Sequence, residues 1–524
     1  MTLTEATRSA ALSVSRPIYG VIDLDLPGPT ISRHLYGHFA EHLGNCIYGG
    51  FFAPGATKVP TRDGIRLDIV EALKALDIPN LRWPGGCFAD EYHWMDGVGP
   101  RTNRPTMVNS NWGSVVEDNS FGTHEFMELC ELLDAEPYIS ANIGSGTVRE
   151  ASEWIEYLTR EDDSPMARLR RANGRDEPWK IRFWGLGNEP WGCGGRFSAE
   201  AYAQVARTFG LYGREHNGNQ LYRIAAGANN DDYHWTEVLM KSLGYQIGSG
   251  EVRGEGAGGF DAISFHYYTL QGGWEAKGLA TEFGLDEYYR TVFAAARIET
   301  LLAGHSAIMD AYDPEKKIGL VLDEWGTWFD VEPGTNPGFL FQQNTLRDAI
   351  VAGIHFDAFH RHADRLAMAN IAQTVNVLQA MILTDGDDMV LTPTYHVFEM
   401  NKGHHDARAL DIRMVGDLPS IEVGEKRVPI VSLSASTKQG RILISLTNAH
   451  AEEITEVTLD LRGAHLGSPV GRILTAATLN AHNTTAAPTS VAPRAFEGVA
   501  LEQGLLRVYL PRHSFVTIEI PTEV

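Results

Sequence analysis

Residues 181–189, IRFWGLGNE, contain the pattern on which the interpretation of this fold depends. An apolar run leads into two glycines, Asn188 and Glu189, which is typical of a buried strand that leaves the core and presents its last side chains to solvent. Residues 318–326, IGLVLDEWG, repeat this pattern and deliver Glu324. We therefore expect two strands that each carry a glutamate at the carboxyl end.

A pair of strand-end glutamates suits the cleavage of an acetal. That reaction needs one carboxylic acid to protonate the leaving oxygen, and one carboxylate on the other face of the sugar ring as nucleophile or as base for water. The alternative is that each glutamate forms an ordinary surface salt bridge, because clustered carboxylates are only probabilistic site markers. The repeated strand-end context favours Glu189 and Glu324 as a catalytic pair.

The composition limits the classes of partner. A chain of 524 residues exceeds a single ordinary core, so we expect one large domain and a smaller one. The net charge of −23 disfavours nucleic acid and anionic membranes as partners, whereas a neutral carbohydrate is compatible. The first 20 residues lack the apolar region of a secretory signal, and no later segment is long enough to span a bilayer. We therefore expect a cytoplasmic protein.

Cysteine and histidine residues do not form metal-binding motifs in the sequence. The four cysteines are widely spaced and lack a CxxC pair, so we expect reduced thiols rather than a disulfide or a zinc site; they are Cys46, Cys87, Cys130 and Cys193. Two histidine-rich segments lack carboxylate or cysteine companions; they contain His355, His360 and His362, and His404 and His405. We expect no metal and no cofactor.

Strand and helix patterns alternate between residues 31 and 395. The eight predicted strands are centred near residues 38, 82, 140, 185, 225, 264, 321 and 369. Strands that alternate with helices predict a parallel sheet, and eight of them predict a (β/α)8 TIM barrel of the α/β class. Active sites of such barrels form at the carboxyl ends of the strands. Five strands place polar residues there, namely Glu41, Asn188, Glu189, His266, Tyr268, Glu324 and Gln373.

The pattern changes near residue 400. Short alternating runs such as GRILISLTNA and ITEVTLDLRG follow one another without intervening helices, which predicts a C-terminal antiparallel β-sandwich over residues 396–524. At the other end of the chain, residues 1–16 are small and polar, and we expect them to be disordered. Residues 17–30 alternate apolar and polar side chains, and we expect this strand to join the C-terminal sandwich.

Six motifs carry a resemblance to a known family. In order they are YGHFAEHLGNCIYGG, LRWPGGCFADEYHWMDGVGPRTNRP, GLGNEPWGCGG, SFHYY, LDEWGTW and MANIAQTVNVLQ, between residues 31 and 379. Together they resemble the α-L-arabinofuranosidases of glycoside hydrolase family 51. The resemblance implies a retaining mechanism with Glu189 as acid/base and Glu324 as nucleophile, their carboxyl groups about 5 to 5.5 Å apart. It also implies a homo-oligomer, with hexamers common in the family.

By the same resemblance, the substrate is a terminal non-reducing α-L-arabinofuranosyl group on oligosaccharides derived from arabinoxylan or arabinan. The implied sugar contacts are Glu41, Cys87, Asn188, Tyr268, Trp328 and Gln373, with His266 placed to orient Glu324 or Tyr268. A core role for His266 and a barrel-rim role for Trp328 are the alternatives. Cys87 and Gly326 stand where many members have asparagine, and a thiol lacks the donors and acceptor of an amide. Substrate preference is therefore less well determined than mechanism.

Two other functions are compatible with the sequence. A barrel glycosidase of different specificity, such as an endo-glucanase or a xylosidase, would keep the fold and both carboxylates. A non-catalytic carbohydrate-binding protein would need neither Glu189 nor Glu324, so the presence of both argues against it. A panel of glycoside substrates separates these alternatives.

Overall fold

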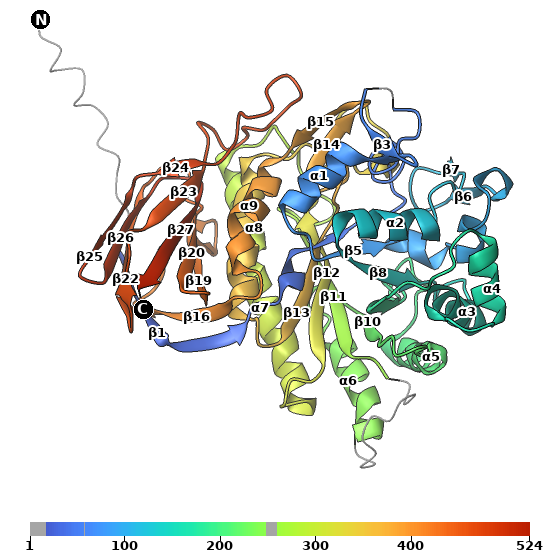
Figure 1. Ribbon diagram of the computed structural model, residues 1–524. Coiled ribbons are helices and arrows are strands. Elements are labelled where there is room, and N and C mark those ends of the chain that lie inside the picture. The colour runs from blue at the N-terminus through green and yellow to red at the C-terminus, as the bar shows by residue number, and fades with distance from the viewer. Residues whose placement is uncertain (1–16, 57, 248–258, 524) are drawn as a thin grey trace, which may run out of the picture.

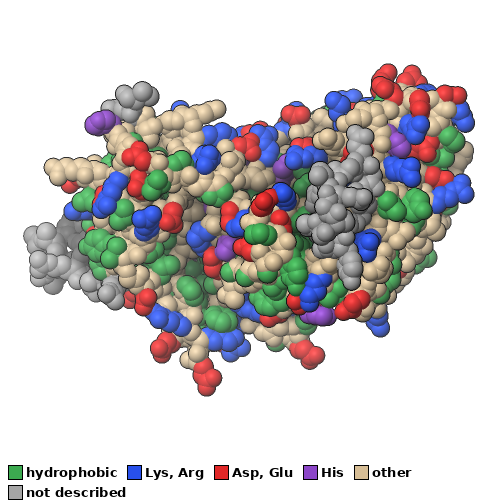
Figure 2. Space-filling model, turned by 90° about the horizontal axis from the view of Figure 1, so that it is seen from below, with side chains coloured by type: hydrophobic (Ala, Val, Ile, Leu, Met, Phe, Trp, Pro, Cys, Tyr) green, Lys and Arg blue, Asp and Glu red, His purple; other side chains and the backbone are tan. Residues whose placement is uncertain are grey.

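The computed structural model describes residues 17–56, 58–247 and 259–523. A barrel and a C-terminal sheet lie side by side, with helices α7, α8 and α9 between them (Figure 1). The segment 1–16, for which we expected disorder, lies outside the described residues. On the face shown in Figure 2, acidic and basic side chains are interspersed and form no single basic patch among the described residues.

Eight parallel strands close the barrel, in the order β10-β11-β12-β13-β2-β5-β8-β9. They are β2 (Gly37–Phe39), β5 (Asn80–Trp83), β8 (Glu136–Ala141), β9 (Phe183–Leu186), β10 (Tyr222–Asn229), β11 (Ala262–Thr269), β12 (Gly319–Thr327) and β13 (Leu366–Ile371). The predicted (β/α)8 barrel is confirmed. Every residue of β12 is buried, as expected for a parallel strand that is covered on both faces.

Helices alternate with these strands and surround the barrel. They are α1 (Leu67–Ala75), α2 (Thr123–Leu133), α3 (Val148–Thr159), α4 (Pro165–Ala172), α5 (Ala199–Tyr212), α6 (Tyr233–Ile247), α7 (Leu285–Tyr312), α8 (Leu346–Arg361) and α9 (Pro393–Asn401). Several begin at a hydroxyl cap; the side chain of Thr147, for example, accepts a hydrogen bond from the Glu150 amide. Among the described residues, no helix combines the length and the apolar character needed to cross a bilayer.

The C-terminal sheet has eleven strands. They are β1 (Ile18–Thr30), β16 (Arg408–Val415), β19 (Val431–Lys438), β20 (Arg441–Asn448), β21 (Thr455–Arg462), β22 (His465–Leu466), β23 (Val470–Leu474), β24 (Arg494–Phe496), β25 (Val499–Glu502), β26 (Leu505–Leu510) and β27 (Ser514–Glu523). Their inward side chains, including Ile442, Ile444 and Leu446, form an apolar core separate from that of the barrel. The N-terminal strand β1 pairs antiparallel with β16 but parallel with β21, so the sheet is mostly antiparallel.

Four short hairpins lie outside the barrel and the C-terminal sheet. They are β3 (Thr61–Arg62) with β4 (Ile65–Arg66), β6 (Met107–Asn109) with β7 (Val115–Glu117), β14 (Ile382–Asp385) with β15 (Asp388–Leu391), and β17 (Ser420–Val423) with β18 (Lys426–Pro429). The hairpin β6–β7 belongs to the long connection that follows β5, and it carries Trp112 toward the barrel mouth.

Helix α8 joins the barrel to the C-terminal sheet. Its residues 346–360 are all buried, because one side faces the strands and the other faces the sheet. His360 binds the hydroxyls of Tyr36 and Ser434, and His404 binds those of Ser436 and Ser445. These histidines therefore have hydrogen-bonding roles at the junction between the two domains.

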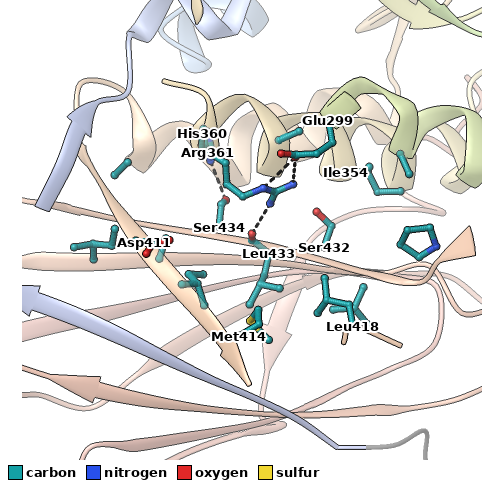
Figure 3. Close-up of a pocket in the computed structure, with 18 of the residues that line it drawn as sticks. Glu299, Ile354, His360, Arg361, Asp411, Met414, Leu418, Ser432, Leu433 and Ser434 are labelled. Carbon is teal, nitrogen blue, oxygen red and sulfur yellow. Dashed lines mark hydrogen bonds and ion pairs between the residues drawn. The ribbon is translucent and has the colours of Figure 1, made fainter. Parts of the chain in front are cut away.

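A cavity of about 450 Å³ lies beside this junction (Figure 3). It is lined mainly by apolar side chains of α7, α8 and the sheet, among them Ile354, Met414 and Leu418. Arg361 also lines the cavity. Its Nη1 donates a hydrogen bond to the carbonyl of Leu433, and its Nη2 donates to the carboxylate of Glu299. Neither Glu189 nor Glu324 lines this cavity.

Candidate active site

The carboxyl ends of the barrel strands meet around a pocket of about 190 Å³. All nine residues predicted for the site line this pocket: Glu41, Cys87, Asn188, Glu189, His266, Tyr268, Glu324, Trp328 and Gln373. They come from loops or strands on different sides of the barrel, which explains why they are far apart in the sequence. The structure therefore brings the predicted residues together.

Glu324 lies on β12 and is held by two donors. Arg82 Nη1 donates to its Oε1 at 2.8 Å, and the Tyr268 hydroxyl donates to its Oε2 at 2.8 Å. The side chain of Glu324 is only 7% exposed. Both carboxylate oxygens are therefore fixed in direction within a site that excludes most water.

Glu189 follows the end of β9 and faces Glu324. Its backbone has a φ of 38°, in the left-handed region that few residues other than glycine adopt. His266 Nδ1 lies 2.8 Å from Oε1, and the sulfur of Cys193 lies 3.6 Å from Oε2. Burial raises the pKa of Glu189, although the contact with His266 opposes this shift. One oxygen of Glu189, one of Glu324 and a ring nitrogen of His266 all lie within 4.8 Å of one another.

His266 connects the two glutamates to a third carboxylate. Its Nε2 lies 3.1 Å from Asp323 Oδ1, while Nδ1 faces Glu189 and Glu324. Burial alone would lower the pKa of His266, but the charge of Glu324 and hydrogen bonds to Asp323 and Glu189 raise it to about 10. Burial likewise opposes ionisation of Asp323, but Arg82 and His266 lower its pKa to about 2. The ring is therefore an imidazolium between carboxylates at neutral pH.

Arg82 also belongs to this buried network, although it was not among the predicted site residues. It lies on β5, is 1% exposed, and donates to Glu324, to Asn188 Oδ1 at 2.6 Å and to Ser140 Oγ at 3.2 Å. The available signal was an arginine inside the apolar strand NLRW, because a buried cation needs an acidic partner. Asp323 gave a similar signal, directly before Glu324.

Glu41 lines the same pocket as the catalytic candidates. Gln373 Nε2 donates to its Oε2 at 2.7 Å, and Trp112 Nε1 donates to its Oε1 at 2.9 Å. Burial and the charge of Glu324 raise the pKa of Glu41 to about 7. Trp112 was also absent from the prediction, because it lies in a connecting hairpin and not at a strand end.

Aromatic side chains form one wall of the pocket. The ring of Trp328 contacts Tyr268 edge to face, with 4.9 Å between ring centroids, and Trp274 contacts Trp328 in the same way. Trp274 is 52% exposed, so the aromatic wall continues from the pocket to the surface. The prediction included Trp328 but not Trp274.

The prediction of four reduced cysteines was wrong for two of them. Cys87 and Cys193 form a disulfide, with 5.5 Å between their Cα atoms and 106 residues between them in the sequence. Sequence spacing could not reveal this pair, because it depends on the meeting of the connections after β5 and β9 at the barrel mouth. Cys46 and Cys130 are free and buried. Cys87 thus lines the pocket as half of a disulfide and not as a thiol.

Two groups of side chains among the described residues have the spacing of metal ligands. They are Cys87, Glu189 and Cys193, and Glu189, His266 and Glu324. In the first group the disulfide engages both sulfurs, and in the second the histidine is a cation bound to carboxylates. The disulfide therefore leaves the first group without the thiolate ligands that a metal ion prefers.

A (β/α)8 barrel with two facing glutamates at the carboxyl ends of its strands has the architecture of a glycoside hydrolase. Comparisons with known proteins identify the family. The model described as "Alpha-L-arabinofuranosidase 1 domain" matches residues 72–234, and "Alpha-L-arabinofuranosidase C-terminal domain" matches residues 323–514. The chain belongs to the α-L-arabinofuranosidases of glycoside hydrolase family 51.

Individual relatives cover almost the whole chain. An intracellular exo-alpha-L-arabinofuranosidase of Bacteroides ovatus is 50% identical over 513 residues, 98% of this chain and 97% of the relative. The family 51 arabinofuranosidase of Xanthomonas axonopodis pv. citri has a crystal structure that matches with a TM-score of 0.92 and 47% identity, covering 96% of this chain and 99% of the other. An arabinose complex of the Thermotoga maritima α-L-arabinofuranosidase matches with a TM-score of 0.82 and 30% identity, covering 96% and 100%.

Proposed function

We propose that this enzyme is a retaining exo-α-L-arabinofuranosidase that acts by double displacement, with Glu324 as nucleophile and Glu189 as acid/base. The observation that carries the proposal is the convergence of the two carboxylates, with atoms of Glu189, His266 and Glu324 all within 4.8 Å of one another. Retaining glycosidases hold their carboxyl groups about 5 to 5.5 Å apart, whereas inverting enzymes leave about 6.5 to 9.5 Å for a water molecule.

The hydrogen bonds around each glutamate support this assignment of roles. Arg82 and Tyr268 donate to the two oxygens of Glu324, which favours a fixed carboxylate that can attack. In contrast, Oε2 of Glu189 faces the sulfur of Cys193 while Oε1 faces His266. Because Oε1 is engaged by His266, we assign the proton that passes to the leaving oxygen to Oε2.

In the first step, the Glu324 carboxylate attacks the anomeric carbon while Glu189 gives its proton to the leaving oxygen. The negative charge of Glu324 contributes to the raised pKa of Glu189. Formation of the glycosyl ester removes this charge. Once that charge is gone, Glu189 is better suited to remain a carboxylate. In the second step it takes a proton from the water that attacks the same carbon, which restores Glu324 and retains the configuration.

The pocket supports recognition of one terminal sugar. Its volume of about 190 Å³ suits a single furanose ring, and Glu41, Asn188 and Gln373 offer polar atoms for the ring hydroxyls. Trp328 also lines the pocket and packs against Tyr268. The substrates that we propose are terminal non-reducing α-L-arabinofuranosyl groups on oligosaccharides from arabinoxylan or arabinan. Because the Bacteroides ovatus relative is named intracellular and exo-acting, we also propose a cytoplasmic, exo-acting enzyme. A homo-oligomer remains part of this proposal.

The test combines substrate choice with stereochemistry. An aryl α-L-arabinofuranoside, a β-xyloside and a β-glucoside are assayed with the wild type, Glu324→Ala and Glu189→Ala. We expect turnover of the arabinofuranoside, a loss of about 10⁴-fold or more in Glu324→Ala, and partial rescue of Glu189→Ala by azide. NMR should show the α-anomer of arabinose as the first product. A β-anomer as first product would refute the retaining mechanism, and turnover of another glycoside alone would refute the specificity.

A further inference from the structure

The Cys87–Cys193 disulfide joins two segments that border the acid/base. Cys87 begins the short helix η2 (Cys87–Asp90), which follows β5, and Cys193 lies in the loop that follows β9. Cys193 is exposed and Cys87 is half-buried at the pocket wall. The bond therefore lies at the barrel mouth, where a soluble reductant can reach it, rather than in the core.

The loop that carries Cys193 is in direct contact with Glu189. The sulfur of Cys193 lies 3.6 Å from Glu189 Oε2 and 3.8 Å from Asn188 Nδ2. The amides of Gly192 and Gly194 donate to the carbonyl of Glu189. A shift of this loop would therefore move both the backbone and the carboxyl group of Glu189.

Helix η2 is the fixed side of this arrangement. The carboxylate of Asp90 accepts hydrogen bonds from the amides of Ile143 and Gly144, both at 2.8 Å, and from the amide of Asn188 at 3.0 Å. The same helix is therefore attached to the chain on both sides of Glu189. Asp90 binds the amide of Asn188, and Cys87 is bonded to Cys193. Two attachments hold a residue whose left-handed backbone, with φ of 38°, is costly without support.

We propose that the Cys87–Cys193 disulfide is a redox-sensitive brace that positions Glu189, so that a dithiol reductant converts the enzyme to a less active form and reoxidation restores it. This inference rests on the proposed acid/base role of Glu189.

The chemistry of the conversion is thiol–disulfide exchange. A thiolate of the reductant attacks the exposed sulfur of Cys193, which breaks the bond to Cys87 and forms a mixed disulfide. The second thiol of the reductant then displaces Cys193. Two electrons and two protons end on Cys87 and Cys193 as thiols, and the reductant leaves as its cyclic disulfide. Exposed disulfides are the ones that reductants commonly open.

Reduction changes the surroundings of Glu189 in two ways. It removes the covalent attachment of the loop, so the carboxyl group is held less firmly in line with the leaving oxygen. It also places a thiol hydrogen beside Oε2, where the disulfide sulfur had none. A donor to the carboxylate favours the charged form and lowers the pKa of Glu189, so less of the acid is protonated at a given pH.

The experiment compares two leaving groups before and after treatment of the folded wild type with dithiothreitol. One arabinofuranoside has an activated aryl leaving group that needs little protonation, and the other has an unactivated alcohol or sugar. Thiol titration in denaturant should count two thiols before treatment, from Cys46 and Cys130, and four afterwards. We expect kcat/KM for the unactivated substrate to fall by about tenfold or more, with little change for the activated one. The basic limb of the pH profile should move to lower pH, and reoxidation should reverse both effects.

Variants separate the brace from general damage. Cys87→Ala/Cys193→Ala should show the low kcat/KM without reductant and no further response to it, while Cys46→Ala/Cys130→Ala should keep the wild-type response. Equal kcat/KM before and after full reduction, within about twofold, would overturn the proposal. An equal loss on both substrates would also overturn it, because it would not involve the acid. Glu189→Ala, measured in parallel without reductant, tests the role of Glu189 itself. A lack of leaving-group dependence there refutes the proposed acid/base role and with it the premise of the brace. A leaving-group-dependent loss in Glu189→Ala, with no response of the wild type to reductant, refutes the brace alone.

Discussion

Replacement of Arg82 by methionine should damage both the stability of the barrel and the reaction. Arg82 donates to Glu324 Oε1 at 2.8 Å and to Asn188 Oδ1 at 2.6 Å, and its Nε lies 3.7 Å from Asp323 Oδ2. Methionine has a similar length and fills much of the same volume, but it has neither charge nor donors. In the variant, His266 is therefore the one remaining cation, among the described residues, beside the buried carboxylates of Asp323 and Glu324.

The expected cost follows from the burial of the network. Arg82 is 1% exposed, and removal of one partner from a buried ion pair costs about 3 to 5 kcal/mol. For a barrel of roughly 350 residues, whose unfolding entropy is about 2.1 cal/mol/K per residue, this cost lowers Tm by about 5 °C. A lost hydrogen bond to a charged group is worth about 1.5 to 3 kcal/mol, so kcat should fall by about 10- to 150-fold at the same time.

Thermal unfolding and steady-state kinetics on an aryl α-L-arabinofuranoside measure the two effects. Arg82→Lys keeps the charge but not the planar fork of donors, and it should fall between the wild type and Arg82→Met. Arg149→Met is the matched control, because Arg149 forms an ion pair on the surface of α3 with its side chain 86% exposed; its Tm should stay within about 1 °C. If Arg82→Met matched Arg149→Met in both Tm and kcat, the buried network would have no role in stability or catalysis.

Asp323 and Glu41, whose pKa values are shifted in opposite directions, each give a further prediction. The pKa of Asp323 is lowered from 3.8 to about 2, so its contribution of about 2 kcal/mol is present above pH 4 and is lost as the pH falls toward 2. Asp323→Asn should flatten the dependence of Tm on pH in that range, and an unchanged slope would contradict the assignment. The pKa of Glu41 is raised to about 7 by burial and by Glu324. Glu41→Gln should raise KM by about tenfold or more, with a smaller change in kcat, because in the proposed function Glu41 contacts the sugar and not the reacting bond; an unchanged KM would exclude that contact.

The eight barrel strands could be predicted because their signal is local. Each strand is a short apolar run that ends in polar or turn residues, and each is followed by a helix pattern, so the closed barrel follows from counting. The barrel rule then places Glu189 and Glu324 at the same mouth, since parallel strands all end on one side. The structure agrees, with both glutamates in one pocket.

Residues whose role depends on neighbours from other strands were harder to predict. Arg82 and Asp323 belong to motifs that were quoted, but their importance comes from contacts with each other, with His266 and with Glu324. Trp112 reaches Glu41 from a hairpin outside the barrel strands. A periodic pattern describes which residues are buried, but it does not describe which buried groups meet.

The sequence alone determined the barrel, the C-terminal sheet and the pair of glutamates, because hydrophobic periodicity and strand-end chemistry are properties of short segments. Only the tertiary structure decided the charge state of the site and the pairing of Cys87 with Cys193. Burial of His266 among three carboxylates, and the 5.5 Å approach of two cysteines that are 106 residues apart, arise from the closure of the barrel. Closure brings together side chains that no local pattern connects.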